Sequence, residues 1–287
     1  MNELLPGFEP SEQDMIDMAL ALPLEAKIEK AILFYQTYCD GAYGAFSGGK
    51  DSCVIKQLAI DAGVKVDWHY NNVTIDPPEL VAFIRKNHAE VKWNNPKTGL
   101  LKRIVEKATP PTRLARWCCE EFKEQGGNGS DKIIGIRIAE SARRAKLWKL
   151  VVPHRKTGKL FLCPICYWTD KDVWDYIKLR NLPYCELYDE LDENGNKLFD
   201  RLGCVGCPLA GPKGQAKEFA RWPNYEKAWK RAFEQMWNKW HGVPNRKGKP
   251  RFFEVYGSWE GMWEWWISGK ALEKDDQCVF EDMMEQR

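Results

Sequence analysis

The chain of 287 residues is 44% hydrophobic and 29% charged, which is typical of a globular protein long enough to bury a substantial core. Its formal charge of +2 does not by itself indicate a nucleic-acid partner, and no apolar run approaches the length of a membrane span. Residues 1–18 are acidic and lack the basic and apolar segments of a secretion signal, so we expect a cytoplasmic protein with no membrane partner.

Helical and strand patterns alternate in the first half of the chain. The predicted helices are Pro23–Tyr38, Ser52–Ala62, Pro77–His88 and Glu140–Trp148, and the predicted strands are Ala42–Phe46, Val64–Tyr70 and Asp131–Arg137. Such alternation predicts an α/β fold, with a Rossmann-like (HUP-type) parallel sheet that has helices on both faces.

The second half has a different pattern, with helices predicted at Asp170–Leu179 and Pro223–Trp240. The segment Lys213–Arg251 holds eleven Lys or Arg against three Glu, and eight tryptophans lie from Trp222 to Trp266. We therefore expect a mainly helical, Trp-rich C-terminal region. A domain boundary near residue 200 divides the chain into 1–200 and 201–287.

The segment Ser47-Gly48-Gly49-Lys50-Asp51-Ser52 lies between a predicted strand and a predicted helix. Its two glycines let the backbone approach a ligand, and the free amides and dipole of a helix start favour a phosphate. Lys50 adds a full positive charge, and the hydroxyls of Ser47 and Ser52 can donate hydrogen bonds. An ordinary glycine turn with a surface lysine is the alternative, which the strand–helix context disfavours.

The spacing from Gly44 to Lys50 also fits a Walker phosphate loop. That loop needs Ser or Thr after the lysine to hold magnesium, but Asp51 stands there, so this interpretation is disfavoured. The segment Ser47–Ser52 instead resembles the signature of the PP-loop superfamily. Members of that superfamily cleave nucleotides between the α and β phosphates or bind a sulfonucleotide in the same cradle.

Further segments resemble the phosphoadenylyl-sulfate (PAPS) reductase family within that superfamily, clearly as far as about residue 210. These segments are Asn72–Glu79, Pro111–Cys119, Gly135–Arg144, Pro164–Tyr176 and Gly203–Pro208. The resemblance implies that 1–200 is a PP-loop domain for ATP or a related adenine nucleotide. It implies that 201–287 carries the cysteine motif and the basic, Trp-rich helices.

Cations that follow strand ends extend the predicted phosphate site, because the carboxyl ends of parallel strands form the ligand crevice. Arginine suits phosphate and sulfate through its planar fork of donors, although a solvated surface arginine is the alternative for each one taken singly. Besides the loop, the candidate nucleotide-binding residues are Thr74, Asp76, Arg113, Arg116, Lys123, Arg137, Glu140, Ser141 and Arg144. Catalytic roles are expected for Lys50, Asp51, Arg137 and Arg144, with Asp51 and Asp76 as aids to Mg²⁺ binding.

The chain has ten cysteines, which in a cytoplasmic protein favour metal or redox chemistry over a disulfide framework. Plain buried thiols are the alternative, which we expect for Cys39 and Cys53 because their neighbours are apolar. The pattern Cys118-Cys119 followed by Cys204-x-x-Cys207 resembles the iron–sulfur motif of the adenylyl-sulfate reductases. It implies a [4Fe–4S] cluster on four thiolates.

The ligand set has alternatives. Cys119 is the least certain ligand, because successive side chains tend to diverge. A second Cys-x-x-Cys, Cys163 to Cys166, can replace the first pair to make a Cys₄ zinc site with Cys204 and Cys207, although the intervening distance is long for a compact zinc module. Cys185 is also nearby in sequence.

Two reactions remain open. Sulfonucleotide reductases use a mobile C-terminal cysteine, but Cys278 lacks the expected flanking residues and has acidic neighbours that raise its pKa. We therefore favour ATP pyrophosphatase chemistry, in which AMP is transferred to an acceptor so that sulfur can replace the activated oxygen. A nucleotide-binding regulator without turnover is a further alternative.

The expected partners of this reaction follow from the same resemblance. A cysteine desulfurase or another sulfur donor is expected, and a homodimer is one open form of the protein. The basic, Trp-rich segment 213–266 fits a nucleic-acid acceptor, with cations on phosphates and aromatic rings under bases. An amphipathic helical core with a solvated basic face explains the same pattern equally well.

Overall fold

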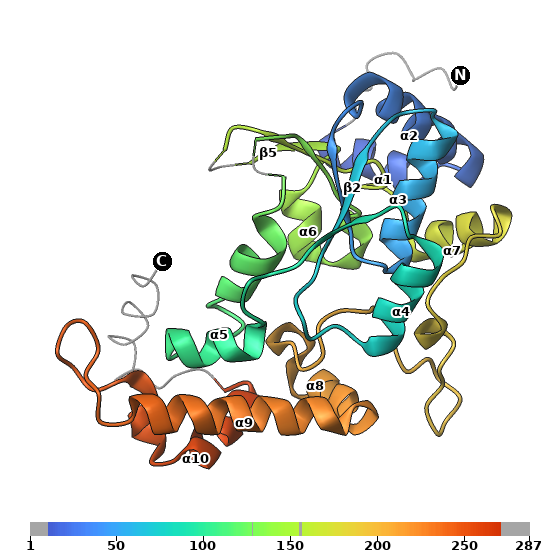
Figure 1. Cartoon of the computed structure of the whole chain (residues 1–287). Helices are drawn as coiled ribbons and strands as arrows, with labels where there is room; N and C mark the ends of the chain where they lie inside the picture. The colour runs from blue at the N-terminus through green and yellow to red at the C-terminus, as the bar shows by residue number, and fades with distance from the viewer. Residues whose placement is uncertain (1–10, 128, 155–156, 271–287) are drawn as a thin grey trace. The chain divides into compact units, whose positions relative to one another are not determined.

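The computed structural model describes residues 11–127, 129–154 and 157–270, which form two compact units (Figure 1). Unit 1 draws on the chain up to Asn71, on Glu79–Asn94 and on Gly126–Arg201. Unit 2 draws on Asn72–Pro78, on Asn95–Gln125 and on the chain from Leu202 onward. Two segments within the first 200 residues therefore belong to unit 2.

Unit 1 is built on a sheet whose described strands follow the order β3-β2-β1-β4-β6-β5. The strands are β1 (Tyr43–Phe46), β2 (Asp67–Asn71), β3 (Lys92–Asn94), β4 (Lys132–Ile133), β5 (Val151–Pro153) and β6 (Leu160–Leu162). All neighbours pair in parallel except β5, which runs antiparallel to β6. The predicted α/β fold with a Rossmann-like, mostly parallel sheet is confirmed.

The helices of unit 1 agree closely with the periodicity of the sequence. They are α1 (Glu12–Ala21), α2 (Leu24–Tyr38), α3 (Lys50–Asp61), α4 (Pro78–Asn87), α6 (Ala142–Leu147) and α7 (Asp170–Leu179). Helix α3 begins at Lys50, two residues earlier than predicted. The strand predicted to reach Arg137 ends at Ile133, although the Ile134 amide still donates to the carbonyl of Leu162. Helix α1 and strands β3, β5 and β6 were not predicted, and each of these strands has only three residues.

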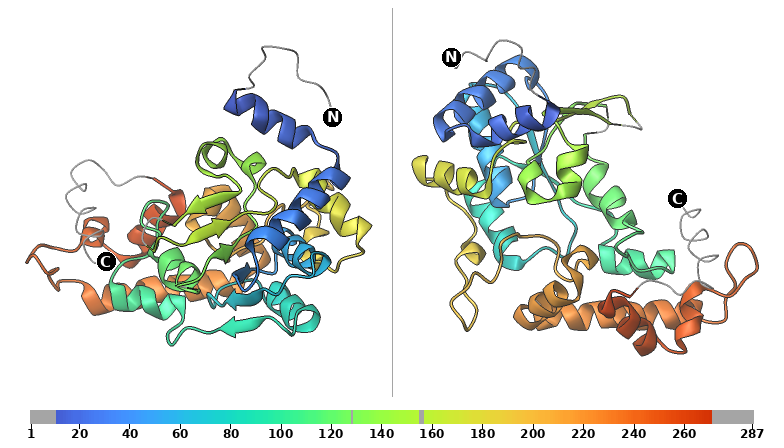
Figure 2. Two further views of the ribbon diagram at one scale, coloured as in Figure 1. Left: turned by 90° about the horizontal axis from the view of Figure 1, so that it is seen from above. Right: turned by 180° about the vertical axis from the view of Figure 1, so that it is seen from behind.

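Unit 2 is mainly helical, as predicted. It contains α5 (Leu100–Lys107), α8 (Gly211–Arg221), α9 (Pro223–Trp240) and α10 (Trp259–Ser268), and α9 has the predicted bounds. Helices α5 and α10 both lie against α9, as the views in Figures 1 and 2 show. None of the helices in the described ranges is both long and apolar enough to cross a membrane.

Tryptophans fill the core of unit 2. Trp222, Trp229, Trp263 and Trp266 are buried, and the rings of Trp229 and Trp266 lie 4.8 Å apart between centroids. The other four tryptophans of this region are half-buried, so none of the eight is fully exposed. The tryptophans of this segment therefore pack in a helical core. The sequence left such a core as an alternative to stacking on nucleic-acid bases.

A hydrogen bond between two helices gives a direct test of the unit 1 core. The buried hydroxyl of Tyr35 on α2 donates to the carbonyl of Ile55 on α3, at 2.6 Å. We expect Tyr35→Phe to lower the free energy of unfolding by about 1 kcal/mol, the net contribution of one such hydrogen bond. Urea titration followed by circular dichroism measures this change.

The control for this experiment is Tyr38→Phe, one turn along the same helix, where the side chain is 56% exposed. Its unfolding midpoint should match that of the parent protein. Equal midpoints for the two variants would contradict the assigned role of the Tyr35 hydroxyl.

Candidate functional site

The candidate nucleotide site lies where the strand order of unit 1 reverses. Strand β1 pairs with β2 on one side and with β4 on the other, and the chain leaves β1 toward β2 but leaves β4 toward β6. Connections that depart in opposite directions open a crevice at the carboxyl ends of the two strands. The Ser47–Ser52 loop follows β1 and Arg137 follows β4, so both predicted elements reach this crevice.

The loop after β1 has the backbone shape that a phosphate cradle needs. Gly48 has a positive φ of 76°, and a Cβ there would lie 2.6 Å from the Ile84 side chain, so glycine is required. Gly49 caps α3 without any side-chain hydrogen bond. The start of α3 therefore presents backbone amides that a ligand can use, apart from the Lys50 amide, which donates to the Tyr188 hydroxyl at 3.1 Å.

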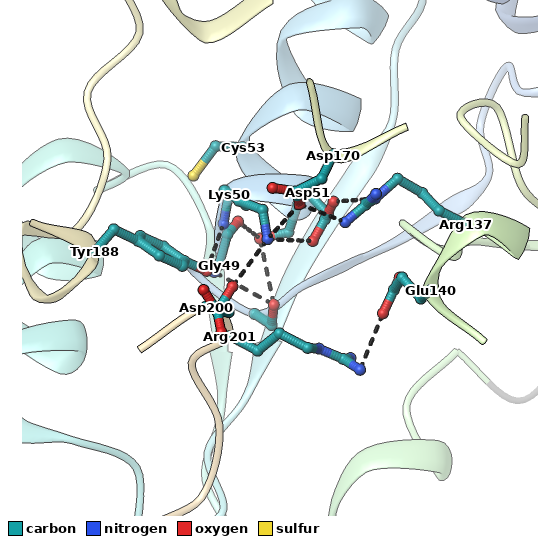
Figure 3. A network of polar contacts seen from close by, with 12 residues as sticks. Gly49, Lys50, Asp51, Cys53, Arg137, Glu140, Asp170, Tyr188, Asp200 and Arg201 are labelled. Atoms are coloured by element: carbon teal, nitrogen blue, oxygen red, sulfur yellow. Dashed lines mark hydrogen bonds and ion pairs between the residues drawn. The ribbon is translucent and has the colours of Figure 1, made fainter. Parts of the chain in front are cut away.

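Lys50 is buried, with only 2% of its surface exposed, and its ammonium points into a polar network (Figure 3). The Nζ atom lies 3.2 Å from Oδ1 of Asp170 and 3.8 Å from Oδ2 of Asp51, and it donates to the Asp200 carbonyl at 3.1 Å. A buried ammonium needs such partners, because an unpaired charge in the interior is strongly destabilising.

Arg137 reaches the same network from the other strand. Only 3% of its surface is exposed, and its Nε donates to Oδ1 of Asp51 at 2.6 Å. Its Nη2 donates to Oδ1 of Asp170 at 3.0 Å, so one oxygen atom of Asp170 contacts both Arg137 and Lys50 (Figure 3). Asp170 is 60% exposed. Two buried cations thus converge on one anion position that solvent can reach.

Three further predicted residues follow Arg137 closely in the chain: Glu140, Ser141 and Arg144. Glu140 pairs with Arg144 and, through its other oxygen, with Arg201 at 2.9 Å. Burial lowers the pKa of Arg144 below its usual value. The Ser141 hydroxyl accepts a hydrogen bond from the Arg144 amide, at 3.3 Å, as the cap of α6. In this structure Ser141 therefore supports the helix that carries Arg144.

Four residues of this network were not among the predicted site residues: Asp170, Tyr188, Asp200 and Arg201 (Figure 3). Asp170 lies inside a segment that resembles the family pattern. That position was the one feature of the sequence that could have marked it as a site residue. Tyr188 contributes a hydroxyl from a short 3₁₀ turn, Glu186–Tyr188, which nothing in the local sequence marks as functional.

The remaining predicted nucleotide ligands belong to unit 2. Thr74 has a left-handed backbone with φ of 71°, and its hydroxyl accepts a hydrogen bond from the Leu100 amide at the start of α5. Arg113 is exposed, and Asp76 is buried. Roles for these residues, and for Arg116 and Lys123, in nucleotide binding stay predictions.

Unit 2 brings the four candidate metal ligands close enough for Cys118 to interact electrostatically with the other three. Cys118 and Cys119 lie at the start of a π-helical turn, Cys119–Glu124, and the Cys118 thiol donates to Cys119. That hydrogen bond is the main reason why the pKa of Cys119 falls below its usual value. The same hydrogen bond and burial are the main causes that raise the pKa of Cys118, and Cys204 and Cys207 add to them.

Two cations accompany these sulfurs. Arg116 donates to Sγ of Cys119 at 3.4 Å, and the Lys123 ammonium bonds to Cys204. Interaction with Cys204 raises the pKa of Lys123, while burial raises the pKa values of the Cys204 and Cys207 thiols. A metal takes the deprotonated sulfur, and cations beside the cysteines favour that form.

The donor set therefore fits an iron–sulfur cluster in residue type. Four thiols come from two loops of one unit, which is the number that a [4Fe–4S] cluster needs. As the side chains stand, no three Cys, His, Asp or Glu residues in the described ranges converge as a metal site. Cluster binding thus requires the cysteine side chains to rotate toward a common centre.

The other described cysteines are buried and neutral, as predicted for Cys39 and Cys53. Burial raises the pKa of these two thiols and of Cys166 to about 12 each, and that of Cys185 to about 11. Cys163 and Cys166 lie in an apolar cluster with Ile138. Protonated thiols in apolar surroundings are poor nucleophiles. The remaining cysteine, Cys278, lies outside the described residues.

Comparison with known proteins places these features in a family. Residues 42–210 match the phosphoadenosine phosphosulfate reductase domain. The chain is 28% identical over 238 residues to MJ0066, an uncharacterised protein of Methanocaldococcus jannaschii, covering 77% of this chain and 45% of that protein. It is 26% identical to the adenosine 5'-phosphosulfate reductase of Staphylococcus haemolyticus, covering 67% of this chain and 81% of that enzyme. The chain spans about half the length of the Methanocaldococcus relatives it matches.

Solved structures with a similar arrangement have low identity to this chain. The phosphoadenylyl-sulfate reductase of Candida auris aligns with a TM-score of 0.43 and 16% identity, covering 63% of this chain and 93% of that one. The FMN adenylyltransferase of Candida glabrata aligns with a TM-score of 0.46 and 14% identity, covering 67% and 69%.

The matched segment is more than half of the chain. It contains the Ser47–Ser52 loop, Arg137 and the four candidate cysteines of unit 2. The chain therefore belongs to the phosphoadenosine phosphosulfate reductase domain family.

Proposed function

We propose that unit 1 binds ATP or a closely related adenine nucleotide with its phosphates on the Ser47–Ser52 loop. The observation that carries this proposal is the convergence of Lys50 and Arg137 on one anion position, at 3.2 Å and 3.0 Å from Oδ1 of Asp170. A phosphate oxygen in that position would replace the carboxylate oxygen and keep both charge-assisted hydrogen bonds. The uncapped start of α3 supplies further amide donors.

The reaction that we propose is adenylyl transfer. An acceptor oxygen attacks the α phosphorus, the bond from that phosphorus to the oxygen bridging to the β phosphate breaks, and pyrophosphate leaves with the electron pair. Lys50 and Arg137 would stabilise the charge that grows on the leaving oxygens. Magnesium, when bound, would neutralise phosphate charge, and Asp51 has a carboxylate beside both cations to hold it. The terminal sulfur of a persulfide from a cysteine desulfurase, or a sulfide donor, would then attack the activated centre while AMP leaves with the electron pair. With a persulfide, a thiol would then reduce the resulting disulfide and release the product.

Reduction of a sulfonucleotide is the second candidate, because relatives such as the Staphylococcus haemolyticus enzyme are named adenosine 5'-phosphosulfate reductase. Reduction needs a reachable, activated thiol that attacks sulfur and is then resolved by another thiol. Cys163, Cys166 and Cys185 are buried with raised pKa values, which makes them poor candidates. Cys278 is the residue on which this alternative depends.

A nucleic acid is our proposed acceptor, and a basic loop of unit 2 supports it. The loop 241–251 follows α9 and extends away from the helices of its unit (Figure 1). The Asn245 side chain accepts hydrogen bonds from the amides of Lys247 and Lys249, at 2.9 Å and 3.1 Å, so the loop is folded. No acidic residue occurs between Glu234 and Glu254, and such a surface attracts phosphodiesters.

We further propose a [4Fe–4S] cluster in unit 2 on Cys118, Cys119, Cys204 and Cys207. The cluster would supply either electron transfer or structural cross-linking, and Arg116 and Lys123 would compensate its negative charge. The thiol–thiol contact of Cys118 with Cys119 supports the adjacent pair as ligands on one side of the cluster.

The role of the phosphate loop is tested by Lys50→Ala. The dissociation constant for ATP should rise about 10- to 100-fold, because a hydrogen bond to a charged group contributes about 1.5–3 kcal/mol. Isothermal titration calorimetry measures the constant. Lys30→Ala, on the exposed surface of α2, is the matched control. Equal affinity in both variants, with folding verified by circular dichroism, would overturn the proposed phosphate site.

The reaction is tested by product analysis. Anaerobic protein with ATP and mixed DNA and RNA should release pyrophosphate, and Arg137→Ala should slow this release about 100-fold or more through lost charge stabilisation. Chromatography of labelled products distinguishes pyrophosphate from orthophosphate. Sulfite made from a sulfonucleotide and a thioredoxin-type reductant, and lost in Cys278→Ser, would decide for the reductase. Nucleotide binding without any product would decide for a regulator.

Metal content tests the cluster. Anaerobically purified protein should contain about four irons per chain and absorb in the visible range. Cys204→Ser should lose the iron, while Cys39→Ser, which alters a buried thiol of unit 1, should keep it. Stoichiometric zinc without iron in the parent protein would contradict the cluster.

A further inference from the structure

The turn of the Cys204-x-x-Cys207 motif is bound by a carboxylate from α8. The Gly206 amide donates to Oε2 of Glu218 at 2.6 Å, and the Cys207 amide donates to the same carboxylate. Burial raises the pKa of this half-buried side chain to about 7, and the two amide contacts oppose that shift. A carboxylate therefore lies directly behind the cysteine turn and takes its amide donors.

Two more buried side chains hold the same turn. The Gln215 side-chain amide donates to the Gly206 carbonyl at 3.0 Å, and the Trp229 indole donates to the Val205 carbonyl at 3.0 Å. Gly206 has a positive φ of 78°, and a Cβ there would lie 2.6 Å from the Phe219 ring. Side chains of α8 and α9 thus fix the turn on its inner side.

The amides taken by Glu218 matter for any metal that the cysteines bind. Amides in a Cys-x-x-Cys turn can donate to the cysteine sulfurs, and such hydrogen bonds stabilise negative charge on sulfur. Glu218 takes the Gly206 and Cys207 amides instead. The loss of these donors to sulfur disfavours the reduced, more negative state of an iron–sulfur centre.

We infer that Glu218 is a positioning residue that shapes the Cys204–Cys207 turn and lowers the reduction potential of the centre that the turn holds. The second part of this inference rests on the proposed cluster, while the first part does not. The Glu218 side chain accepts from backbone amides of the turn, so we assign it a role that acts through the cysteines and not as a ligand.

Hydrogen exchange on metal-free, full-length protein tests the first part. Glu218→Ala should speed exchange of the Gly206 and Cys207 amides roughly 10- to 100-fold, since each loses a hydrogen bond to a charged acceptor. Glu218→Gln keeps one acceptor oxygen and should give an intermediate rate. Glu234→Gln, at an exposed position of α9, should leave both rates unchanged. Unchanged rates in both Glu218 variants would overturn the positioning role.

Redox titration of anaerobically reconstituted protein tests the second part. Glu218→Gln should keep its iron and shift the midpoint potential in the positive direction, because a neutral amide oxygen is a weaker acceptor and frees the turn amides to donate to the cysteine sulfurs. Glu234→Gln should keep the parent potential. An unchanged or more negative potential in Glu218→Gln would overturn the claim.

The two experiments also distinguish a failure of this inference from a failure of the proposed cluster. If the parent protein binds no iron, the cluster and the claim about potential both fail, while the exchange rates still decide whether Glu218 positions the turn. If Glu218→Ala fails to fold, Glu218→Gln decides both experiments.

Discussion

One oxygen atom of Asp170, shared by two buried cations, is the contact on which the candidate site of unit 1 depends. Lys50 comes from the start of α3, Arg137 from the chain after β4, and Asp170 from the first turn of α7. Burying two cations is strongly unfavourable unless anions meet them, so Asp51 and Asp170 hold three separate elements in register. Because Asp170 is exposed, another anion can reach this position and replace its carboxylate as the partner of the two cations.

The sheet explains why these elements meet. Parallel strands β1 and β4 end side by side, and their connections depart in opposite directions. Gly135, after β4, has no Cβ, and a Cβ there would lie 3.2 Å from that of Asp51, so glycine lets the two loops approach closely. Backbone geometry thus sets the spacing of the charges, and the charges in turn fix the side chains.

Unit 2 holds the cysteines of a short turn in place. Its helices pack around tryptophans, and one of these, Trp229, both fills the core and donates a hydrogen bond to the cysteine turn. The aromatic content that suggested base stacking is thus largely used for packing. The basic residues stay at the surface, because helices α8 and α9 bury their apolar faces against each other and against α10.

The sequence by itself determined the α/β class, the long helices and the phosphate loop, since periodicity and glycine spacing are local properties that a strand–turn–helix unit keeps. It also named Lys50 and Arg137 among the candidate catalytic residues, through the family pattern. The short strands β3, β5 and β6, the hydroxyl of Tyr188 and the carboxylates of Asp170 and Glu218 depended on tertiary structure. The partners of Tyr188 and Asp170 lie 138 and 33 residues away in the chain, and hydrogen bonds over such separations leave no period in a sequence. Which residues share a site is therefore decided by strand order and packing.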